Sequence, residues 1–338
     1  MSNIAIIGAG AWGTGLAIVL GRKGTHRVRL WAHETHVCDS ITRNRVNEAF
    51  LPGRRIPETI TASNNLAFAL EEAQIVVSVM PSQHCRALFE RVRSSIPART
   101  LIVSATKGLE EGSLLRMSEV VAQVLQRSDD SAIGALSGPS FAQEVARGDP
   151  TAVTIASKDE TLLSVVQQEF SDPSFRVYTN PDVIGVELGG ALKNIVAIAA
   201  GICDGLGLGH NSVAALITRG LAEMTRLAVA CGGRAETMAG LAGLGDLVLT
   251  CTGGLSRNRS VGVELGRGRK LPEILTAMHG MVAEGVFTTT AAVGLAHAGG
   301  IELPITEQMH AILHQGKPPR DAIYELMTRS GKSEGLGS

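Results

Sequence analysis

The sequence predicts an α/β protein in which a parallel-sheet domain is followed by an all-helical domain. Short apolar runs alternate with helical stretches in the first half of the chain. Helical periodicity replaces this alternation from Ile184 onward, and the turn-forming residues 180–182 interrupt the chain between the two patterns. We therefore expect domains at residues 1–185 and 186–330, with residues 331–338 as a flexible tail.

Length and composition limit the class of protein. A chain of 338 residues is long enough for two domains, each with its own hydrophobic core. With 44% hydrophobic residues, 19% charged residues and a net charge of −1, the chain has no excess of basic residues to attract nucleic acid. The 39 glycines and 3% aromatic residues suit a tightly packed α/β enzyme, and the balanced charge predicts no nucleic-acid partner.

The five cysteines form no Cys-x-x-Cys or Cys/His cluster, so we expect neither a metal site nor a disulfide framework. Free thiols fit a reducing compartment. The chain opens directly into an expected strand at Asn3, which leaves no room for a signal peptide. The apolar run after Lys193 reaches Asp204 after about ten residues, too few to span a bilayer. These features predict a cytoplasmic protein without a membrane span.

A glycine-rich turn follows the first expected strand. Residues 3–7 form a continuous apolar run, typical of a strand buried on both faces, and Gly8, Gly10 and Gly13 then open an apolar helix. In this G-x-G-x-x-G pattern the first glycine permits the tight turn, the second lets a pyrophosphate approach the backbone, and the third lets helix and strand pack closely. The turn predicts a Rossmann-type dinucleotide-binding domain; a glycine-rich turn in an unrelated α/β protein is the alternative.

The tip of the second expected strand bears on the choice between NAD and NADP. Glu34 lies near the place where an acidic residue normally binds the adenosine ribose, but His33 precedes it. Arg43 and Arg45, on the following helix, could receive a 2′-phosphate or could simply form a solvated face. The residues alone leave both cofactors open.

Polar or glycine-bearing segments follow three later strands and are expected at one edge of the sheet. Ligands of open parallel sheets bind outside the carboxyl ends of the strands. Lys107 is the only cation in these segments, so it is a candidate ligand for substrate charge; a surface lysine at the start of a loop is the alternative. The later expected strands are 74–80, 100–105, 132–136, 151–156 and 175–179, and the segments are Met80-Pro81-Ser82, Ala105-Thr106-Lys107-Gly108 and Ser137-Gly138-Pro139-Ser140.

One helix in the second half is apolar on nearly every face. Within residues 184–203 the only charged residues are Glu187 and Lys193, so Lys193 is expected inside the protein, where an ammonium must be paired or its pKa falls. Buried lysines often act as acid/base catalysts. The pair Gly189-Gly190 indicates that another backbone or a ligand lies close to that side. Lys193 is therefore the first catalytic candidate; a lysine that reaches from the apolar face to water is the alternative.

Two further segments carry charge in places that need an explanation. Asp246 lies in GLGDLVL, where a buried carboxylate needs a partner, and Lys193 is the proposed partner; an aspartate that caps the next helix is the alternative. Ser256 is a candidate N-cap for a helix that begins Arg257-Asn258-Arg259. The helix dipole disfavours arginine there, so the segment indicates a bound phosphate; a solvent-facing turn is the alternative.

Eight segments together are more specific than a dinucleotide fingerprint: GAGAWGTGLA, ATKGLE, SGPSFAQE, VELGGALKNIVAIAAGICDGLGLG, ALITRGLAEM, GLGDLVLTC, SRNRSVG and PITE. They resemble the bacterial NAD(P)-dependent glycerol-3-phosphate dehydrogenases along nearly the whole chain. This resemblance implies hydride transfer with NAD(P)H that interconverts dihydroxyacetone phosphate and sn-glycerol 3-phosphate, the precursor of phospholipids. It also implies that NAD and NADP are both accepted, often with NADP preferred; a homodimer is compatible with it.

The same resemblance implies roles for particular residues. Lys193 would be the general acid/base, with Lys107 and Asp246 as the other catalytic candidates beside the substrate. The substrate would contact Lys107, Gly138, Ser140, Lys193, Asp246, Ser256, Arg257 and Asn258. The nucleotide would contact Gly8, Gly10, Ala11, Trp12, Gly13, His33, Lys107, Ala142, Arg257, Val282 and Glu284.

Two positions depart from the family pattern. Ala11 replaces a serine, which removes one side-chain hydrogen bond to the cofactor but keeps the backbone amide. His210 lies at a position that varies in the family, so no role is assigned to it.

Other interpretations are open at this point. A β-hydroxyacid or 6-phosphogluconate dehydrogenase would share the two-domain build, although the SRNR segment argues against a substrate with carboxylate alone. A nucleotide-diphosphosugar dehydrogenase would need a nucleophilic cysteine, and no cysteine lies in such a setting. A non-catalytic redox sensor would need an output surface such as a basic helix-turn-helix, which the sequence does not show.

Overall fold

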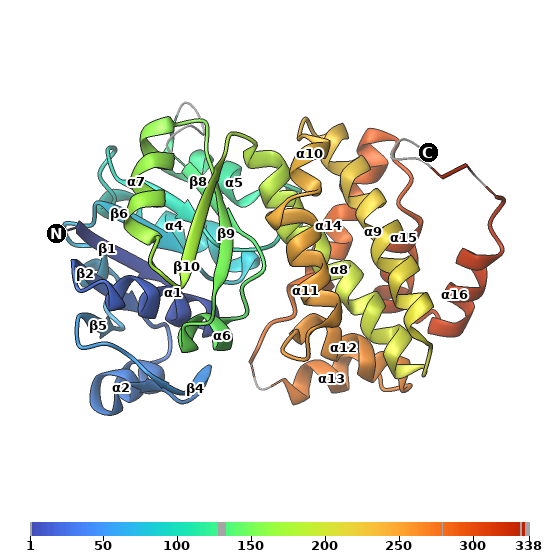
Figure 1. Cartoon of the computed structure of the whole chain (residues 1–338), viewed down its shortest axis with the longest axis horizontal. Helices are drawn as coiled ribbons and strands as arrows, with labels where there is room; N and C mark the ends of the chain where they lie inside the picture. The colour runs from blue at the N-terminus through green and yellow to red at the C-terminus, as the bar shows by residue number, and fades with distance from the viewer. Residues whose placement is uncertain (1, 128–132, 279, 332, 335–338) are drawn as a thin grey trace. The chain divides into compact units, whose positions relative to one another are not determined.

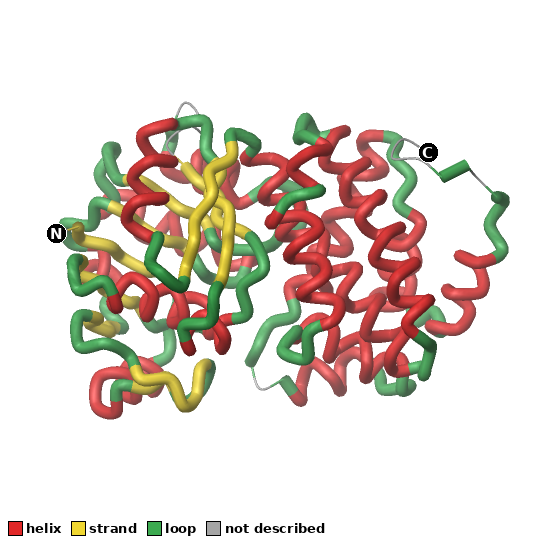
Figure 2. Tube along the Cα trace, in the orientation of Figure 1, coloured by secondary structure: helices red, strands yellow, loops and turns green. Residues whose placement is uncertain are grey.

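The computed structural model of the chain describes residues 2–127, 133–278, 280–331 and 333–334. Packing divides the chain into two compact units: Met1–Thr106 with Met117–Val183, and Lys107–Arg116 with Ile184–Ser338. Within the described residues, the strands all belong to the first unit (Figure 2). The division into 1–185 and 186–330 stays a proposal, and the expected tail, 331–338, lies largely outside the described residues.

The described part of the first unit contains an eight-stranded sheet with the order β10-β9-β8-β7-β6-β1-β2-β5. Neighbouring strands are parallel except β8 and β9, which are antiparallel. The strand order reverses at β1, which is where nucleotides bind in sheets of this kind, so the Rossmann-type domain is confirmed. The strands are β1 (Ser2–Ile7), β2 (His26–Trp31), β5 (Ile60–Ser63), β6 (Ile75–Ser78), β7 (Leu101–Ser104), β8 (Ile133–Ser137), β9 (Thr151–Ala156) and β10 (Phe175–Asn180).

Helices cover both faces of this sheet (Figure 1). Val77 and Val103 belong to a buried cluster that includes side chains of α1 and α7, whereas the alternate residues Val76 and Ile102 are buried on the other face, where α4 packs against α5. Burial on both faces explains why the strands are apolar runs rather than alternating ones. The helices are α1 (Ala11–Arg22), α2 (Thr35–Asn44), α3 (Leu66–Leu70), α4 (Cys85–Val92), α5 (Met117–Leu125), α6 (Ala142–Arg147) and α7 (Glu160–Phe170), with single turns η1 (Ser82–His84) and η2 (Arg93–Ser95).

Three short strands have no clear signal in the sequence. β5 lies at the edge of the sheet, and β3 (Val46–Asn47) pairs with β4 (Leu51–Arg55) in a separate two-stranded sheet. Their residues are mostly polar or exposed, so no continuous apolar run marks them.

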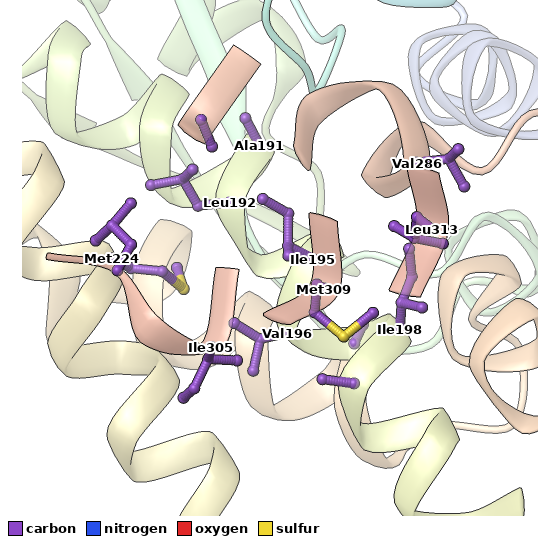
Figure 3. Close-up of a cluster of buried hydrophobic side chains, with 14 of the residues drawn as sticks. Ala191, Leu192, Ile195, Val196, Ile198, Met224, Val286, Ile305, Met309 and Leu313 are labelled. Atoms are coloured by element: carbon purple, nitrogen blue, oxygen red, sulfur yellow. The ribbon is translucent and has the colours of Figure 1, made fainter. Parts of the chain in front are cut away.

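The second unit is helical, as expected from the sequence (Figure 1). Its core is built around α8: Ile195 and Ile198 belong to one buried cluster with Met224 of α9, Val286 of α14 and Met309 of α15 (Figure 3). The elements are α8 (Val183–Gly205), α9 (His210–Ala230), α10 (Ala235–Met238), the π-helical turn η3 (Leu241–Gly245), α11 (Asp246–Thr252), α12 (Arg257–Gly266), α13 (Leu271–Ala277), α14 (Glu284–Gly299), α15 (Pro304–Gln315) and α16 (Pro319–Met327).

Helix α8 is also the one helix of the described chain that is long and apolar enough by itself to cross a membrane. In the protein, 94% of its most apolar stretch is buried. The expectation that this region is too short to span a bilayer considered only the residues after Lys193, whereas the helix has 23 residues. Its burial within the protein, rather than its length, identifies it as a core helix.

Paired glycines bring α12 against α8. A Cβ at Gly262 would overlap the carbonyl oxygen of Ile198 and lie 2.8 Å from its carbonyl carbon, and a Cβ at Gly266 would lie 2.6 Å from the carbonyl oxygen of Ile202. Gly201 and Gly205 of α8 face the same crossing. The two backbones therefore touch, and the start of α12 is placed directly beside the middle of α8.

Candidate active site

The glycine turn after β1 has the geometry of a nucleotide site. Gly8 has a φ of +120°, and a Cβ there would lie 2.5 Å from the carbonyl oxygen of Val79, so only glycine fits. A Cβ at Gly13 would overlap the carbonyl oxygen of Gly8. Gly10 precedes α1, and a Cβ there would meet no described atom within 4 Å. The N-terminus of α1 is thus open to an anion, and the turn fits a dinucleotide.

The side chain of Asn47 holds this turn by hydrogen bonds, and the sequence analysis did not identify it. Its buried side chain donates hydrogen bonds to the carbonyl oxygen of Ala9 at 2.8 Å and to Thr14 Oγ1 at 2.9 Å. It also accepts one from the amide of Phe50 at 3.1 Å. A single asparagine in a polar stretch gives no signal of this role, because Ala9 and Thr14, to which it donates, lie more than thirty residues away in the chain.

Three candidates for nucleotide contact, Ala11, Trp12 and His33, lie on α1 or at the end of β2 in the first unit. Ala11 is the first residue of α1, and the Trp12 ring lies 6.5 Å from the ring of Phe175. The His33 ring lies 5.7 Å from that of Trp31, at the end of β2. Their contacts with a nucleotide stay proposals.

The segment after β8 is shaped by its glycine. Gly138 has a φ of +140°, and a Cβ there would lie 2.9 Å from the Cα of Val153. Ser140 Oγ donates a hydrogen bond to the carbonyl oxygen of Gly138 at 2.9 Å. Ala142 begins α6 and packs against Gly15 of α1, so this segment lies next to the helix that follows the glycine turn.

The two arginines considered for a 2′-phosphate differ in environment. The Arg45 guanidinium donates hydrogen bonds to the carbonyl oxygens of Ile56 at 3.2 Å and Ile60 at 3.1 Å, and to that of Pro57. It therefore braces the loop before β5. Arg43 is exposed, with Asp39 at 3.6 Å, and matches the solvated face.

One carboxylate in the second unit holds two lysines. Lys193 is buried, and its Nζ donates hydrogen bonds to Asp246 Oδ1 at 2.5 Å and to Thr250 Oγ1 at 2.7 Å. Lys107 Nζ donates to Asp246 Oδ2 at 2.6 Å. The predicted pair of Lys193 and Asp246 is present, and Thr250 was missed; its position four residues after Asp246 on α11 was the available signal.

The two lysines and the aspartate change each other's ionisation. The pKa of Lys193 is lowered from 10.5 to about 8, because burial and the charge of Lys107 together outweigh the opposing effect of Asp246. Burial would raise the pKa of Asp246, but the two ammoniums outweigh it and keep the pKa below 3.8. At neutral pH the cluster therefore holds an ionised carboxylate and a Lys193 ammonium that can lose a proton.

The ammonium of Lys193 has one hydrogen left over. It carries three hydrogens, and among the described residues two of them are donated, to Asp246 and Thr250. The third hydrogen is available to a ligand. A buried donor with this freedom is what a proton donor to a substrate oxygen requires.

The start of α12 combines a capped helix with a cation. Ser256 Oγ accepts a hydrogen bond from the amide of Arg259 at 3.2 Å, so the predicted N-cap is confirmed. Arg257 is exposed, and Glu284 at the start of α14 acts on it electrostatically. Arg259 pairs instead with Asp204 near the end of α8. Arg257 is thus the arginine of this segment that can meet a ligand.

A chain of buried amide hydrogen bonds aligns three elements of this unit. Asn258 Nδ2 donates to Asn194 Oδ1 at 3.0 Å, and Asn258 Oδ1 accepts from the amide of Gly285 at 2.9 Å. Asn258 therefore braces α8, α12 and α14, and within the described residues its side-chain amide donates only one of its two hydrogens. Val282 lies in the loop just before α14. The residues that precede the three braced positions are Lys193, Arg257 and Glu284.

The described residues give little support to a cysteine nucleophile or to a metal site. Burial raises the pKa of the Cys251 thiol to about 12, so this thiol, next to the lysine cluster, is not a nucleophile. No group of three or more His, Cys, Asp or Glu side chains in the described residues could hold a metal ion.

Comparisons with known proteins match both halves of the chain. Residues 3–163 match the family profile "NAD-dependent glycerol-3-phosphate dehydrogenase N-terminus", and residues 182–324 match the corresponding C-terminus profile. A glycerol-3-phosphate dehydrogenase [NAD(P)+] of Koribacter versatilis is 65% identical over 334 residues, which are 99% of each chain. That of Acidobacterium capsulatum is 56% identical over 338 residues, 99% of this chain and 100% of the relative.

Comparison with solved structures finds the same family. The glycerol-3-phosphate dehydrogenase of Coxiella burnetii is 45% identical, with a TM-score of 0.92 over 97% of this chain and 99% of that one. The yeast enzyme is 26% identical, with a TM-score of 0.80 over 97% of this chain and 99% of that one. The chain therefore belongs to the NAD-dependent glycerol-3-phosphate dehydrogenase family.

Proposed function

We propose that this protein is an NAD(P)-dependent glycerol-3-phosphate dehydrogenase that interconverts dihydroxyacetone phosphate and sn-glycerol 3-phosphate. The observation that carries the proposal is the buried Lys193 with a spare hydrogen, in a chain 65% identical to a dehydrogenase of that name. The glycine turn supplies the second requirement, a helix N-terminus open to a dinucleotide.

The mechanism assigns each step to residues of the chain. The N-terminus of α12 and Arg257 bind the substrate phosphate, which fixes the three-carbon skeleton. When bound, the nicotinamide cofactor supplies or accepts the hydride. Lys193 donates a proton to the oxygen that develops negative charge, or removes it in the reverse direction. Asp246 and Thr250 orient Lys193, and Lys107 adds positive potential.

The remaining candidates complete two binding surfaces. Gly138 and Ser140 would contact the substrate together with Ser256 and Asn258. The nucleotide would rest on the glycine turn with Ala11, Trp12, His33, Ala142, Val282 and Glu284 as neighbours. Both NADP and NAD are proposed as cofactors, with NADP slightly favoured.

A spectrophotometric assay tests the proposal. The oxidation of NADPH and of NADH is followed with dihydroxyacetone phosphate, and with the keto acids of the β-hydroxyacid dehydrogenases as rivals. Turnover of dihydroxyacetone phosphate above all others is expected. Nucleotide binding without turnover of any ketone would favour the non-catalytic sensor.

Replacing Arg257 with alanine is expected to raise KM for dihydroxyacetone phosphate by about 10–100-fold, because charge-assisted hydrogen bonds to phosphate contribute about 1.5–3 kcal/mol. The fold should persist, since the side chain is exposed. Steady-state kinetics give KM, with Arg267→Ala, at the exposed residue that follows α12, as the matched control. An unchanged KM would place the phosphate elsewhere.

The pKa of Lys193 predicts opposite pH profiles for the two directions. Reduction needs the ammonium, so kcat/KM for the ketone should fall as pH rises above about 8. Oxidation needs the neutral amine, so kcat/KM for glycerol 3-phosphate should rise up to about pH 8 and then level off. Rates measured in both directions from about pH 6 to about pH 10 check this. Profiles with no break near pH 8 would assign the proton to another group.

The broader setting is part of the same proposal. Glycerol 3-phosphate made by this reaction would supply phospholipid synthesis, and the free thiols fit the cytoplasm. A homodimer is proposed as the assembly, and size-exclusion chromatography with light scattering tests it.

A further inference from the structure

The segment Lys107–Arg116 is an unusual part of the second unit. It follows β7 and precedes α5, both in the first unit, yet it packs with the helices of the second unit. Its two ends are joined by an isolated antiparallel bridge between Leu109 and Arg116. The segment is thus a small hairpin, and Lys107 stands at its beginning.

Backbone and core contacts hold the hairpin in one conformation. The Leu109 side chain is fully buried in the core of the second unit. Leu114 has a φ of +62°, which is strained for a leucine, and its side chain packs against Gly294 of α14, where a Cβ would lie 3.0 Å from it. Strained backbone persists only where the surroundings hold it in place.

A buried ion pair joins the end of the hairpin to α8. Arg116 Nη1 donates a hydrogen bond to Glu187 Oε2 at 2.7 Å, and only 10% and 5% of the two side chains are exposed. Glu187 lies on the helix that carries Lys193, fewer than two turns earlier. The hairpin is therefore attached to α8 through Arg116 and to Asp246 on α11 through Lys107.

We propose that Arg116 and Glu187 are positioning residues that hold the hairpin so that Lys107 stays on Asp246 beside Lys193. This inference rests on the proposed function. Leu109 lies two residues after Lys107 and is bridged to Arg116, so the ion pair of Arg116 with Glu187 restrains the backbone that carries the Lys107 side chain. The ion pair thus helps to keep two cations at the Asp246 carboxylate.

The consequence appears in the ionisation of Lys193. The charged and titratable groups that face Lys193 are Asp246 and Cys251 on α11 and Lys107 on the hairpin. Lys107 lowers the pKa of Lys193, so a hairpin that drifts away leaves Lys193 with Asp246 alone and raises that pKa. The pH profile is therefore a readout that a purely structural ion pair would not move.

The experiment compares Arg116→Met with Arg116→Lys and with the double variant Arg116→Met/Glu187→Met. The double variant removes both charges of the pair, so it should fold even where the single variant, which keeps the buried Glu187 carboxylate without the Arg116 guanidinium, is unstable. Lys317→Met, which breaks the ion pair of the partly buried Lys317 with the exposed Glu325, is the matched control. Each protein is assayed with dihydroxyacetone phosphate and NADPH across pH, with circular dichroism to confirm folding.

In both methionine variants kcat is expected to fall by about tenfold or more. The loss should be smaller than that caused by removing one catalytic donor, which is typically about 10²–10³-fold. The pH at which reduction declines should move upward, while Kd for NADPH stays unchanged. Arg116→Lys, which keeps the charge, should recover most of the activity and the original pH profile.

Other results separate this inference from the proposed function. An inactive wild-type protein would refute the function itself. An active wild type with a folded double variant of unchanged kcat and pH profile would refute only the positioning role. Loss of activity in the double variant with an unmoved pH profile would also refute it, because the change would then act elsewhere than on Lys107.

Discussion

Replacing Lys193 with methionine is expected to lower kcat for reduction of dihydroxyacetone phosphate by about 10²–10⁴-fold, the usual contribution of general acid–base catalysis. The variant should fold, because methionine fills the buried site and Asp246 keeps Lys107 as a partner. Replacing Asp246 would be less informative, since it would leave two lysines without their carboxylate.

The measurement separates chemistry from binding. Steady-state kinetics give kcat, and fluorescence titration gives Kd for NADPH, which should not change because the glycine turn belongs to the first unit. Lys270→Met, at an exposed lysine of the second unit, is the control and should behave as wild type. Near-normal turnover by the Lys193 variant would exclude it as the proton donor.

Replacing Gly262 with alanine is expected to destabilise the second unit by about 2 kcal/mol or more. The added Cβ would overlap the carbonyl oxygen of Ile198, and a main-chain atom cannot rotate away as a side chain can. Overpacking costs about 1–3 kcal/mol, occasionally more, and an overlap with a main-chain oxygen lies at or above the top of that range, so about 2 kcal/mol or more is left after the gain of about 1 kcal/mol in helix propensity. KM for the phosphorylated ketone should rise as well, because α12 begins with the proposed phosphate site.

Thermal unfolding checks this prediction, and a fall in Tm of about 5 °C or more is expected for a unit of this size. Gly209→Ala is the matched control: a Cβ at Gly209 would meet no described atom within 4 Å. Equal Tm values for the two variants would show that α8 and α12 can separate without cost.

Local patterns in the sequence were sufficient for the main elements. The apolar runs at residues 3–7 and 151–156 are strands, because burial on both faces requires apolar residues at every position. The glycine turn could be predicted in detail, since Gly8 and Gly13 fill positions that admit no Cβ. The burial of Lys193 followed from the apolar residues around it on α8.

Most partners distant in the chain could not be predicted in this way, although the pair of Lys193 and Asp246 was, because a charge in each apolar segment needed an opposite charge. No local pattern places Lys107 on a carboxylate 139 residues later, assigns residues 107–116 to the helical unit, or joins Asn194, Asn258 and Gly285. Likewise, Arg45 was a candidate phosphate ligand until its guanidinium proved to be bonded to loop carbonyls.

The difference between what local patterns predict and what they miss has a physical cause. Periodicity and glycine placement report how each residue meets its own helix, strand or turn, and these constraints act within a few positions of the chain. Whether a buried charge is neutralised, and by which group, depends on how helices such as α8, α11 and α12 cross. Those crossings are set by the packing of the whole core, so the sequence identified the residues that needed partners, and the tertiary structure chose the partners.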